Sequence, residues 1–300
     1  MDGTIAAREL NFHWLAIFRS VARSGGVTAA AAALAISQPS VSAQVRSLER
    51  ALGLTLVERV GRRVRLTDHG TRMLAYADRI FTLADDLQRE ATDLRAGTAG
   101  RLVIGASTTV GDYVLPAVLG RFRQAWPAVE ILAQVGNSAM VEARLLAGEW
   151  DLGLVGEPLD HPTIVATTFA SDSIVLVASP EHRLAGRRVE PSDLRGEGLV
   201  SREPGSATRK ATERTLEAGG VAPRVVMELG SNDAVKRAVA AGLGLGALST
   251  RAVAPELQAG WLVLLDAPWF RCERPLVLLQ HRDRLLSRAE QAFIALLRQV

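Results

Sequence analysis

The chain has 300 residues, of which 48% are hydrophobic and 22% are charged, and it contains one cysteine, Cys272. This composition excludes an intrinsically disordered protein, and a single thiol excludes an intrachain disulfide framework. A length of 300 residues predicts two or more domains, because single hydrophobic cores seldom grow beyond that size.

The N-terminal residues lack the basic-then-apolar order of a secretory signal. The longest uncharged run, residues 24–45, contains Gly25, Gly26 and Pro39 and is too polar to span a membrane. These features predict a cytoplasmic protein without a membrane-spanning segment.

Positive charge is concentrated near the N-terminus. Residues 1–67 contain nine arginines and four acidic residues, whereas the formal charge of the whole chain is only +3. A basic segment on a near-neutral body indicates an anionic partner for that segment. A solvated, charged face would produce the same distribution, so charge alone leaves both interpretations open.

Two short helices are predicted first. Apolar side chains recur at helical spacing over residues 12–22, and the pair Gly25–Gly26 ends this first helix. Thr28 stands where an N-cap would begin a second, alanine-rich helix over residues 29–34.

A third helix follows after a tight turn. Ser37 is placed to cap it, Pro39 lies in its first turn, where proline is tolerated, and Gly53 follows its last residue. Its apolar residues form one stripe, which comprises Val41, Val45, Leu48 and Leu52. A short helix, a tight turn and a helix with small polar residues at its exposed start predict a helix-turn-helix that enters the major groove of DNA.

Residues 56–59 and 64–67 have the pattern of two short strands around a turn that contains Gly61. This hairpin predicts a wing with arginines near the DNA backbone or minor groove. The candidate DNA contacts of the whole segment are Thr28, Gln38, Pro39, Ser40, Ser42, Arg46, Arg62 and Arg63. For any one of these side chains, plain solvation is the alternative explanation.

Residues 68–95 are predicted to form one long helix. Its apolar residues alternate at spacings of four and three and comprise Met73, Ala77, Ile80, Ala84, Leu87, Ala91 and Leu94. This 3.5-residue repeat favours pairing with a second copy of the chain, and hence a homodimer. The alternative is a helix that lies on its own domain.

From residue 101, strands alternate with helices, which is typical of α/β domains with mainly parallel sheets. Strands are predicted at residues 101–106, 129–135, 151–155, 173–178, 198–200, 225–229, 245–248 and 274–280. Their order predicts two lobes around a cleft, the first comprising residues 101–162 and 269–300 and the second residues 163–268.

Hydroxyl and amide side chains follow several of these strands, at or near predicted helix N-termini, where free N–H groups and the helix dipole favour an anion. The candidate ligand-binding residues are Ser107, Thr108, Thr109, Asn137, Ser138, Ser201, Arg202, Ser206 and Thr208. Arg202 is the candidate counter-charge. The set predicts a pocket for a small anionic metabolite, and simple N-capping by these residues is the alternative.

Several enzyme signatures are missing from the sequence. It contains no Gly-x-x-x-x-Gly-Lys loop, no His-Glu-x-x-His and no Gly-x-Ser-x-Gly, and its five histidines lack metal-ligand spacing. The glycine-rich run 242–246 precedes a predicted strand, whereas a dinucleotide fingerprint follows one. The sequence therefore predicts no catalytic residue, no metal site and no cofactor.

The stretch Ser37–Glu49, with Leu52-Gly-Leu54, residues 56–59, residues 64–67 and Gly70, strongly resembles the DNA-binding domain of LysR-type transcriptional regulators. The resemblance covers roughly residues 8–95. Ala43 stands where many members carry arginine, so the expected contacts shift to Ser42 and Arg46.

The C-terminal part is similar to the effector domain of the same family. Residues 106–116, 202–209 and 227–231 look most like the branch that contains sulfur-assimilation and Calvin-cycle regulators. The inducer itself does not follow from this likeness.

The resemblance implies an α/β protein with three parts: a winged helix-turn-helix over residues 8–67, a dimerisation helix over residues 68–95, and an effector domain over residues 101–300. The effector domain is expected to have the fold of periplasmic solute-binding proteins. Double-stranded promoter DNA, a small anionic effector, and association into homodimers and homotetramers are the implied partners.

Two other functions stay open at this point. The chain could be a solute-binding protein in which the N-terminal segment is an adaptor, although residues 37–49 argue against it. An enzyme with an appended helix-turn-helix is the weaker third hypothesis.

Overall fold

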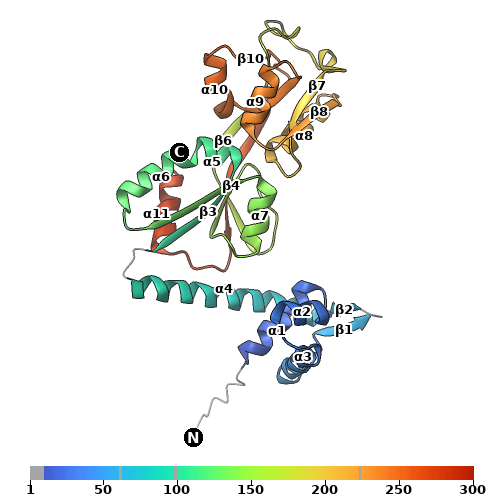
Figure 1. Cartoon of the computed structure of the whole chain (residues 1–300), viewed down its shortest axis with the longest axis vertical. Helices are drawn as coiled ribbons and strands as arrows, with labels where there is room; N and C mark the ends of the chain where they lie inside the picture. Colours follow the sequence, from blue (N-terminus) through green and yellow to red (C-terminus); the bar gives the residue numbers. More distant parts are fainter. Residues whose placement is uncertain (1–9, 61–62, 97–99, 223) are drawn as a thin grey trace. The chain divides into compact units, whose positions relative to one another are not determined.

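The computed structural model describes residues 10–60, 63–96, 100–222 and 224–300, and within these ranges all side chains except those of residues 59, 60, 63, 89, 90 and 92–96. The chain divides into two compact units, Met1–Gln88 and Arg89–Val300, and most of their elements are labelled in Figure 1. None of the described helices is long and apolar enough to cross a membrane.

The first unit contains a helical domain with a two-stranded wing. Its elements are α1 (Phe12–Ser24), α2 (Val27–Leu34), α3 (Gln38–Leu52), β1 (Val57–Val60), β2 (Arg63–Leu66) and α4 (Asp68–Ala96). The strands β1 and β2 pair antiparallel. The three helices and the winged hairpin predicted from the sequence are therefore present.

The helix ends follow the local chemistry of the sequence with one exception. Ser37 Oγ accepts a hydrogen bond from Ser40 N at 3.3 Å and caps α3, and Gly53 ends α3 in the left-handed region at φ 68°. The predicted cap at Thr28 is wrong, because α2 begins one residue earlier, at Val27, with Gly26 as its N-cap. Thr28 thus lies in the first turn of α2.

Two apolar clusters hold this domain together. One joins α1, α2 and α3 through residues that include Ile17, Ala30 and Val41, and the other places Phe18 and Leu48 against the start of α4. The predicted stripe of α3 is buried as expected, apart from a partly exposed last residue.

Part of the predicted dimer seam on α4 packs against the core of its own domain. Ala77 is fully buried, and Met73 and Ile80 pack beside it against the second cluster. These three residues of the predicted seam therefore contribute to the core of their own domain. Farther along, Leu87 is 71% exposed. The side chain of Leu94 lies outside the described residues.

The second unit is built on a sheet of nine strands in its described part. The strands are β3 (Arg101–Ser107), β4 (Glu130–Gly136), β5 (Leu152–Val155), β6 (Ile164–Ala178), β7 (Gly198–Arg202), β8 (Arg224–Leu229), β9 (Leu245–Ser249), β10 (Val263–Leu264) and β11 (Cys272–His281). Their order is β4-β3-β5-β11-β6-β9-β7-β8, with β10 paired to β6.

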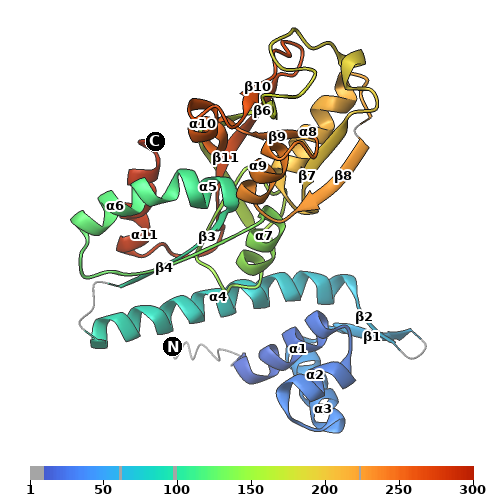
Figure 2. The same cartoon turned by 45° about the horizontal axis from the view of Figure 1, so that its top comes forward.

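The helices of this unit are α5 (Thr108–Tyr113), α6 (Leu115–Ala125), α7 (Ser138–Leu146), α8 (Ala207–Ala218), α9 (Asn232–Ala240), α10 (Thr250–Gln258) and α11 (Arg288–Leu297), with a short 3-10 turn, η1 (Pro191–Leu194). In the first lobe, α6 and α11 cover one face of the sheet and α7 the other (Figures 1 and 2). In the second lobe, α8 covers one face, and α9 and α10 the other.

The two lobes share one continuous sheet. Within each lobe the strands around β3 and around β7 are parallel, as predicted. The long strands β6 and β11 are antiparallel to each other over ten paired positions. They run through both lobes, since β11 also pairs with β5 and β6 also pairs with β9. These two strands are the covalent connections between the lobes.

Candidate functional site

The start of α3 presents an exposed polar face. Gln38, Pro39 and Arg46 are exposed, and Ser40 and Ser42 are half-buried. The apolar stripe on the opposite side of α3 is buried in the core of the domain, which fixes the direction in which this face points. A helix held in this way offers short hydrogen-bonding side chains and one guanidinium group to an outside partner.

The other predicted DNA contacts lie on α2 and the wing. Thr28 is exposed. Arg62 lies outside the described residues, and Arg63 begins β2 with a side chain that is also outside them.

The wing is fixed to α3 by the carboxylate of Glu49, which was not among the candidate site residues. Glu49 Oε1 of α3 accepts hydrogen bonds from Leu56 N at 2.7 Å and Val57 N at 3.2 Å. Gly70 of α4 also lies against this segment, because an added Cβ would stand 2.0 Å from Leu56 O. The helix α3, the wing and the first turn of α4 are therefore held together as one rigid surface.

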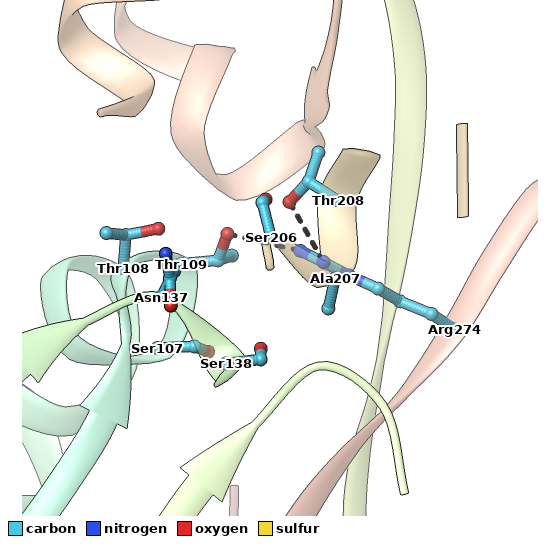
Figure 3. Close-up of a pocket in the computed structure, with 9 residues that line it drawn as sticks. All are labelled: Ser107, Thr108, Thr109, Asn137, Ser138, Ser206, Ala207, Thr208 and Arg274. Carbon is cyan, nitrogen blue, oxygen red and sulfur yellow. Dashed lines mark hydrogen bonds between the residues drawn. The ribbon is translucent and has the colours of Figure 1, made fainter. Parts of the chain in front are cut away.

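The second candidate site is a pocket between the two lobes (Figure 3). Its lining residues come from β3, α5, α7, α8 and β11 and comprise Ser107, Thr108, Thr109, Asn137, Ser138, Ser206, Ala207, Thr208 and Arg274. Seven of the nine predicted ligand-binding residues are thus brought together. The cavity volume is about 10 Å³, which is room for roughly one water molecule. The lobes are closed on each other in this arrangement.

Arg274 of β11 is the cation of this pocket. Its NH1 group donates to Thr208 Oγ1 at 2.9 Å, and its NH2 group donates to Thr109 Oγ1 at 3.1 Å, so it bonds to both lobes (Figure 3). Nε and NH2 donate to Asp172 Oδ2 of β6 at 2.9 and 2.8 Å. Neither residue of this ion pair has more than 3% of its side chain exposed.

Sequence reasoning missed Arg274 as a ligand-binding candidate. The available signal was a charged residue at the start of an otherwise apolar predicted strand, residues 274–280. That signal did not identify a partner, because Asp172 is about one hundred residues away in the chain and becomes its neighbour only through the pairing of β6 with β11.

Two of the pocket residues also cap helices. Asn137 Oδ1 accepts from Met140 N at 2.9 Å at the start of α7, and Ser206 Oγ accepts from Arg209 N at 3.5 Å at the start of α8. The capping alternative is therefore true for these two residues, although they line the pocket as well. Ser138 is different: its hydroxyl is buried and has no hydrogen-bond partner among the described residues. An unpartnered buried hydroxyl in a polar pocket is a ready contact for a ligand.

The predicted role of Arg202 as the counter-charge is not supported. Arg202 is only 2% exposed and does not line the pocket. Its guanidinium is paired with Glu203 through two hydrogen bonds of 2.7 and 2.9 Å. NH1 bonds to Thr108 Oγ1 at 3.0 Å, so Arg202 joins the lobes from behind the pocket. Ser201, its neighbour in β7, is buried and also lies outside the lining.

A third contact between the lobes lies farther from the pocket. Lys236 Nζ of α9 lies 3.4 Å from the hydroxyl of Tyr113 in α5, and 2.7 Å from Glu256 Oε1 of α10. Burial disfavours the charge on Lys236, but hydrogen bonds to Glu256 and Asp233 raise its pKa above the usual value. Burial also raises the pKa of Tyr113. The contact therefore joins a lysine cation to a neutral phenol at pH 7.

Among the described residues, no group of three or more His, Cys, Asp or Glu side chains is arranged to hold a metal ion.

Family profiles match most of the chain. The profile of the bacterial regulatory helix-turn-helix protein, lysR family, matches residues 12–71, and that of the LysR substrate binding domain matches residues 95–300.

Relatives that match nearly the whole chain are also transcriptional regulators. The HTH-type transcriptional activator CmpR of Synechocystis sp. is 34% identical over 288 residues, covering 96% of this chain and 94% of the relative. The RuBisCO operon transcriptional regulator of Acidithiobacillus ferrooxidans is 34% identical over 291 residues, covering 97% and 94%. Regulators of a RuBisCO operon agree with the predicted likeness to Calvin-cycle regulators.

Among solved structures, the regulatory domain of Synechocystis PCC6803 CcmR in complex with 2-PG is 32% identical, with a TM-score of 0.62. The match covers 66% of this chain and 96% of the CcmR domain.

Proposed function

Because the chain belongs to the LysR family of bacterial transcriptional regulators, we propose that it reads operator DNA with α3 and is switched by a small anionic metabolite between its lobes. The relatives are regulators and not enzymes. The observation that supports the switch most strongly is the polar pocket between the lobes, with Arg274 and the unpartnered hydroxyl of Ser138.

In this proposal, the exposed start of α3 enters the major groove. Gln38, Ser40 and Ser42 contact base edges, whereas Arg46 contacts a phosphate, since a guanidinium suits phosphate oxygens and short polar side chains suit base edges. Pro39 and Thr28 lie against the DNA backbone, and Arg62 and Arg63 of the wing reach the adjacent backbone or minor groove.

The DNA interface is tested by the salt dependence of binding. The full chain is titrated with a duplex from its own promoter region at several salt concentrations. Arg46→Ala should weaken binding and lower the slope of log affinity against log salt by about 0.9, the contribution of one phosphate contact. Arg195→Ala, a change of an exposed arginine in the second unit, is the control. An unchanged slope in the Arg46 variant would contradict the phosphate contact.

The effector pocket accepts an anion by opening. The closed cavity holds about one water, so a metabolite enters when the lobes separate along β6 and β11. The anion then bonds to Arg274, Ser138 and the hydroxyls of Thr108, Thr109 and Thr208. The N-termini of α7 and α8, which also face the pocket, favour the same sign of charge. Since the structure of the CcmR regulatory domain is a complex with 2-PG, 2-PG is the first candidate ligand.

Ligand binding is tested by calorimetry with 2-PG and then with other small anions. Ser138→Ala should weaken the binding of a true effector by about tenfold, because it removes a hydrogen bond to a charged ligand. The folded protein should be unaffected, since Ser138 Oγ has no partner among the described residues. Ser201→Ala is the matched control, because Ser201 is also buried but does not line the pocket. Equal effects of the two variants would contradict the site.

We expect the protein to act as a dimer joined through residues 68–95, with further association into tetramers, and to be cytoplasmic. Its parts are the DNA-binding domain, residues 8–67, the linker helix, residues 68–95, and the effector domain, residues 101–300. The exposed apolar side chains of α4, which are Tyr76, Leu83 and Leu87, support the dimer. Two recognition helices can then read two half-sites.

A further inference from the structure

A second and larger cavity lies on the lobe that contains α8, outside the interlobe pocket. Trp269 and Cys272 pack in the apolar cluster of this second lobe, so the start of β11 belongs to it, and not to the first lobe as predicted from the sequence. The cavity has a volume of about 500 Å³ and is bounded by α8, by η1 and by the segment that leads into β11. This volume is in the range of small-molecule sites, which is roughly 300–1,000 Å³. The proposed DNA-binding and switching functions make no use of it.

One wall of this cavity is a fixed aromatic ring. Trp269 lines the cavity, and its Nε1 donates to Val189 O at 2.9 Å. The ring also lies against Gly219, where an added Cβ would stand 2.5 Å from the ring. The indole is therefore held from two sides, and with Ala211 and Ala218 of α8 it offers a preformed apolar surface.

Two arginines and one glutamate line the cavity. Arg271 is exposed and has no ion pair within the described residues, whereas Arg214 is paired with Glu157 at 3.2 Å. Glu273 is the one acidic side chain in the lining. Burial raises the pKa of the Cys272 thiol, so this residue adds no negative charge at neutral pH. Arg271 is thus the cation that can bind an anion without breaking an internal pair.

We propose that this cavity is a second ligand site, which takes a planar organic carboxylate with its ring against Trp269 and its carboxylate at Arg271. A flat apolar wall selects the ring, and a guanidinium suits the two oxygens of a carboxylate. The proposal is independent of the identity of the ligand between the lobes.

The position of this site relates it to the interlobe pocket. Its walls are α8 and the start of β11, and the same two elements supply Thr208 and Arg274 to the interlobe pocket. A ligand in the second cavity therefore contacts elements that also form the first site, which is the physical requirement for coupling between two sites.

The test uses three probes with the same ring and different charge: indole-3-acetate, indole and tryptamine. Each is titrated into the full chain by calorimetry. Indole-3-acetate should bind most tightly, and tryptamine least. Arg271→Ala should weaken indole-3-acetate about tenfold and leave indole unchanged, because only the charged contact is lost. Ala218→Trp, which fills the cavity, should remove the binding of both.

Two further variants locate the binding. Arg224→Ala removes an exposed arginine of the same lobe that is not part of the cavity and should leave all affinities unchanged. Ser138→Ala alters the interlobe pocket and should also have no effect. Absence of binding, equal affinities of the three probes, or loss of binding in the Ser138 variant would overturn the proposal. Because Arg271 is exposed, Arg271→Ala should fold normally. Its effect on indole-3-acetate binding therefore tests the proposal even if Ala218→Trp fails to fold.

Discussion

Arg274 is a buried cation that forms an internal ion pair and also lines the pocket between the lobes. Its guanidinium is almost completely withdrawn from water and satisfied by Asp172, Thr109 and Thr208. In the closed arrangement, its NH1 and NH2 groups therefore donate to the two threonine hydroxyls, where a bound anionic ligand would accept these bonds instead. Ligand binding exchanges these internal bonds for bonds to the anion, so its net free energy is smaller than the contacts alone suggest.

The ion pair of Arg274 predicts a large cost for removing its counter-charge. Asp172→Asn should lower the free energy of unfolding of the second unit by about 3 kcal/mol, because it leaves a buried charge uncompensated. Glu149→Gln is the comparison, since it breaks the exposed pair of Arg144 and Glu149 at 3.0 Å and should cost less than about 1 kcal/mol. Urea unfolding of the full chain measures both. Similar small costs would mean that Arg274 finds another partner.

The backbone conformation of Ala35, at the end of α2, predicts how a glycine at this position changes stability. Ala35 follows α2 with φ 53°, the one described non-glycine residue in the left-handed region. Ala35→Gly should stabilise the helix-turn-helix by up to about 1 kcal/mol, since glycine adopts this conformation without steric cost. Ala32→Gly, in the exposed interior of the same helix, should destabilise it by a similar amount. Hydrogen exchange of the α2 and α3 amides distinguishes these opposite signs, and slower exchange in the Ala32 variant would refute the argument.

Among the elements, α4 has one face that packs in the domain core and another that is exposed. Its first half completes the core of the DNA-binding domain through Ala77, with Met73 and Ile80 beside it. Its exposed apolar side chains lie at Tyr76, Leu83 and Leu87, on a face that is partly rotated from the predicted seam. A helix of 29 residues can serve both purposes because its successive turns present different faces along its length.

The exposed face of α4 predicts how the dimer is broken. Leu87→Asp should shift the chain from dimer to monomer, because it places a charge in an apolar interface. Gln88→Asp puts the same charge on the next, also exposed residue and should leave the dimer intact. Sedimentation equilibrium reports the change in mass. A dimer that survives Leu87→Asp would show that another surface joins the protomers.

At the scale of the whole effector unit, closure of the lobes depends on a few polar contacts. Besides those of Arg274, they include the bonds of Arg202 with Thr108 and of Lys236 with Tyr113, and the backbone bond from Ala139 N to Gly205 O at 3.2 Å. Glu157 of the first lobe also pairs with Lys210 and Arg214 of α8, at 3.5 and 3.2 Å. The net free energy of each such bond is about 1 to 3 kcal/mol, with the larger values for the charged donors, which is comparable to the free energy of a single contact with a bound ligand. A sheet that is continuous through β6 and β11 keeps the lobes in register while they move.

This arrangement predicts that Tyr113→Phe favours the open state. The change removes the hydrogen bond to Lys236 and should speed hydrogen exchange of the α5 amides by about fivefold, the equivalent of roughly 1 kcal/mol. Tyr76→Phe is the control, since Tyr76 is the only other tyrosine of the chain and is exposed on α4. Unchanged exchange in the Tyr113 variant would mean that this contact does not hold the lobes together.

Local sequence patterns predicted most of the elements in their correct order, but not α10 and not the first half of β6, which begins at Ile164 and not at residue 173. Helical periodicity, the cap at Ser37 and the glycine at Gly53 act locally, so they predicted α3 and its exposed face correctly. Strands that alternate with helices likewise predicted two α/β lobes with a cleft. Seven of the nine candidate ligand-binding residues line the pocket because strand ends and helix starts converge there in this architecture.

Which charges form ion pairs depends on the three-dimensional fold of the chain. Arg202, the candidate counter-charge, is paired with Glu203 and does not line the pocket. Arg274 lines the pocket, and the pairing of β11 with β6 brings its partner Asp172 beside it. The division of α4 between core and exposed face likewise depends on what packs against Ala77. Such pairings depend on contacts between residues far apart in the chain, and local periodicity contains no information about them.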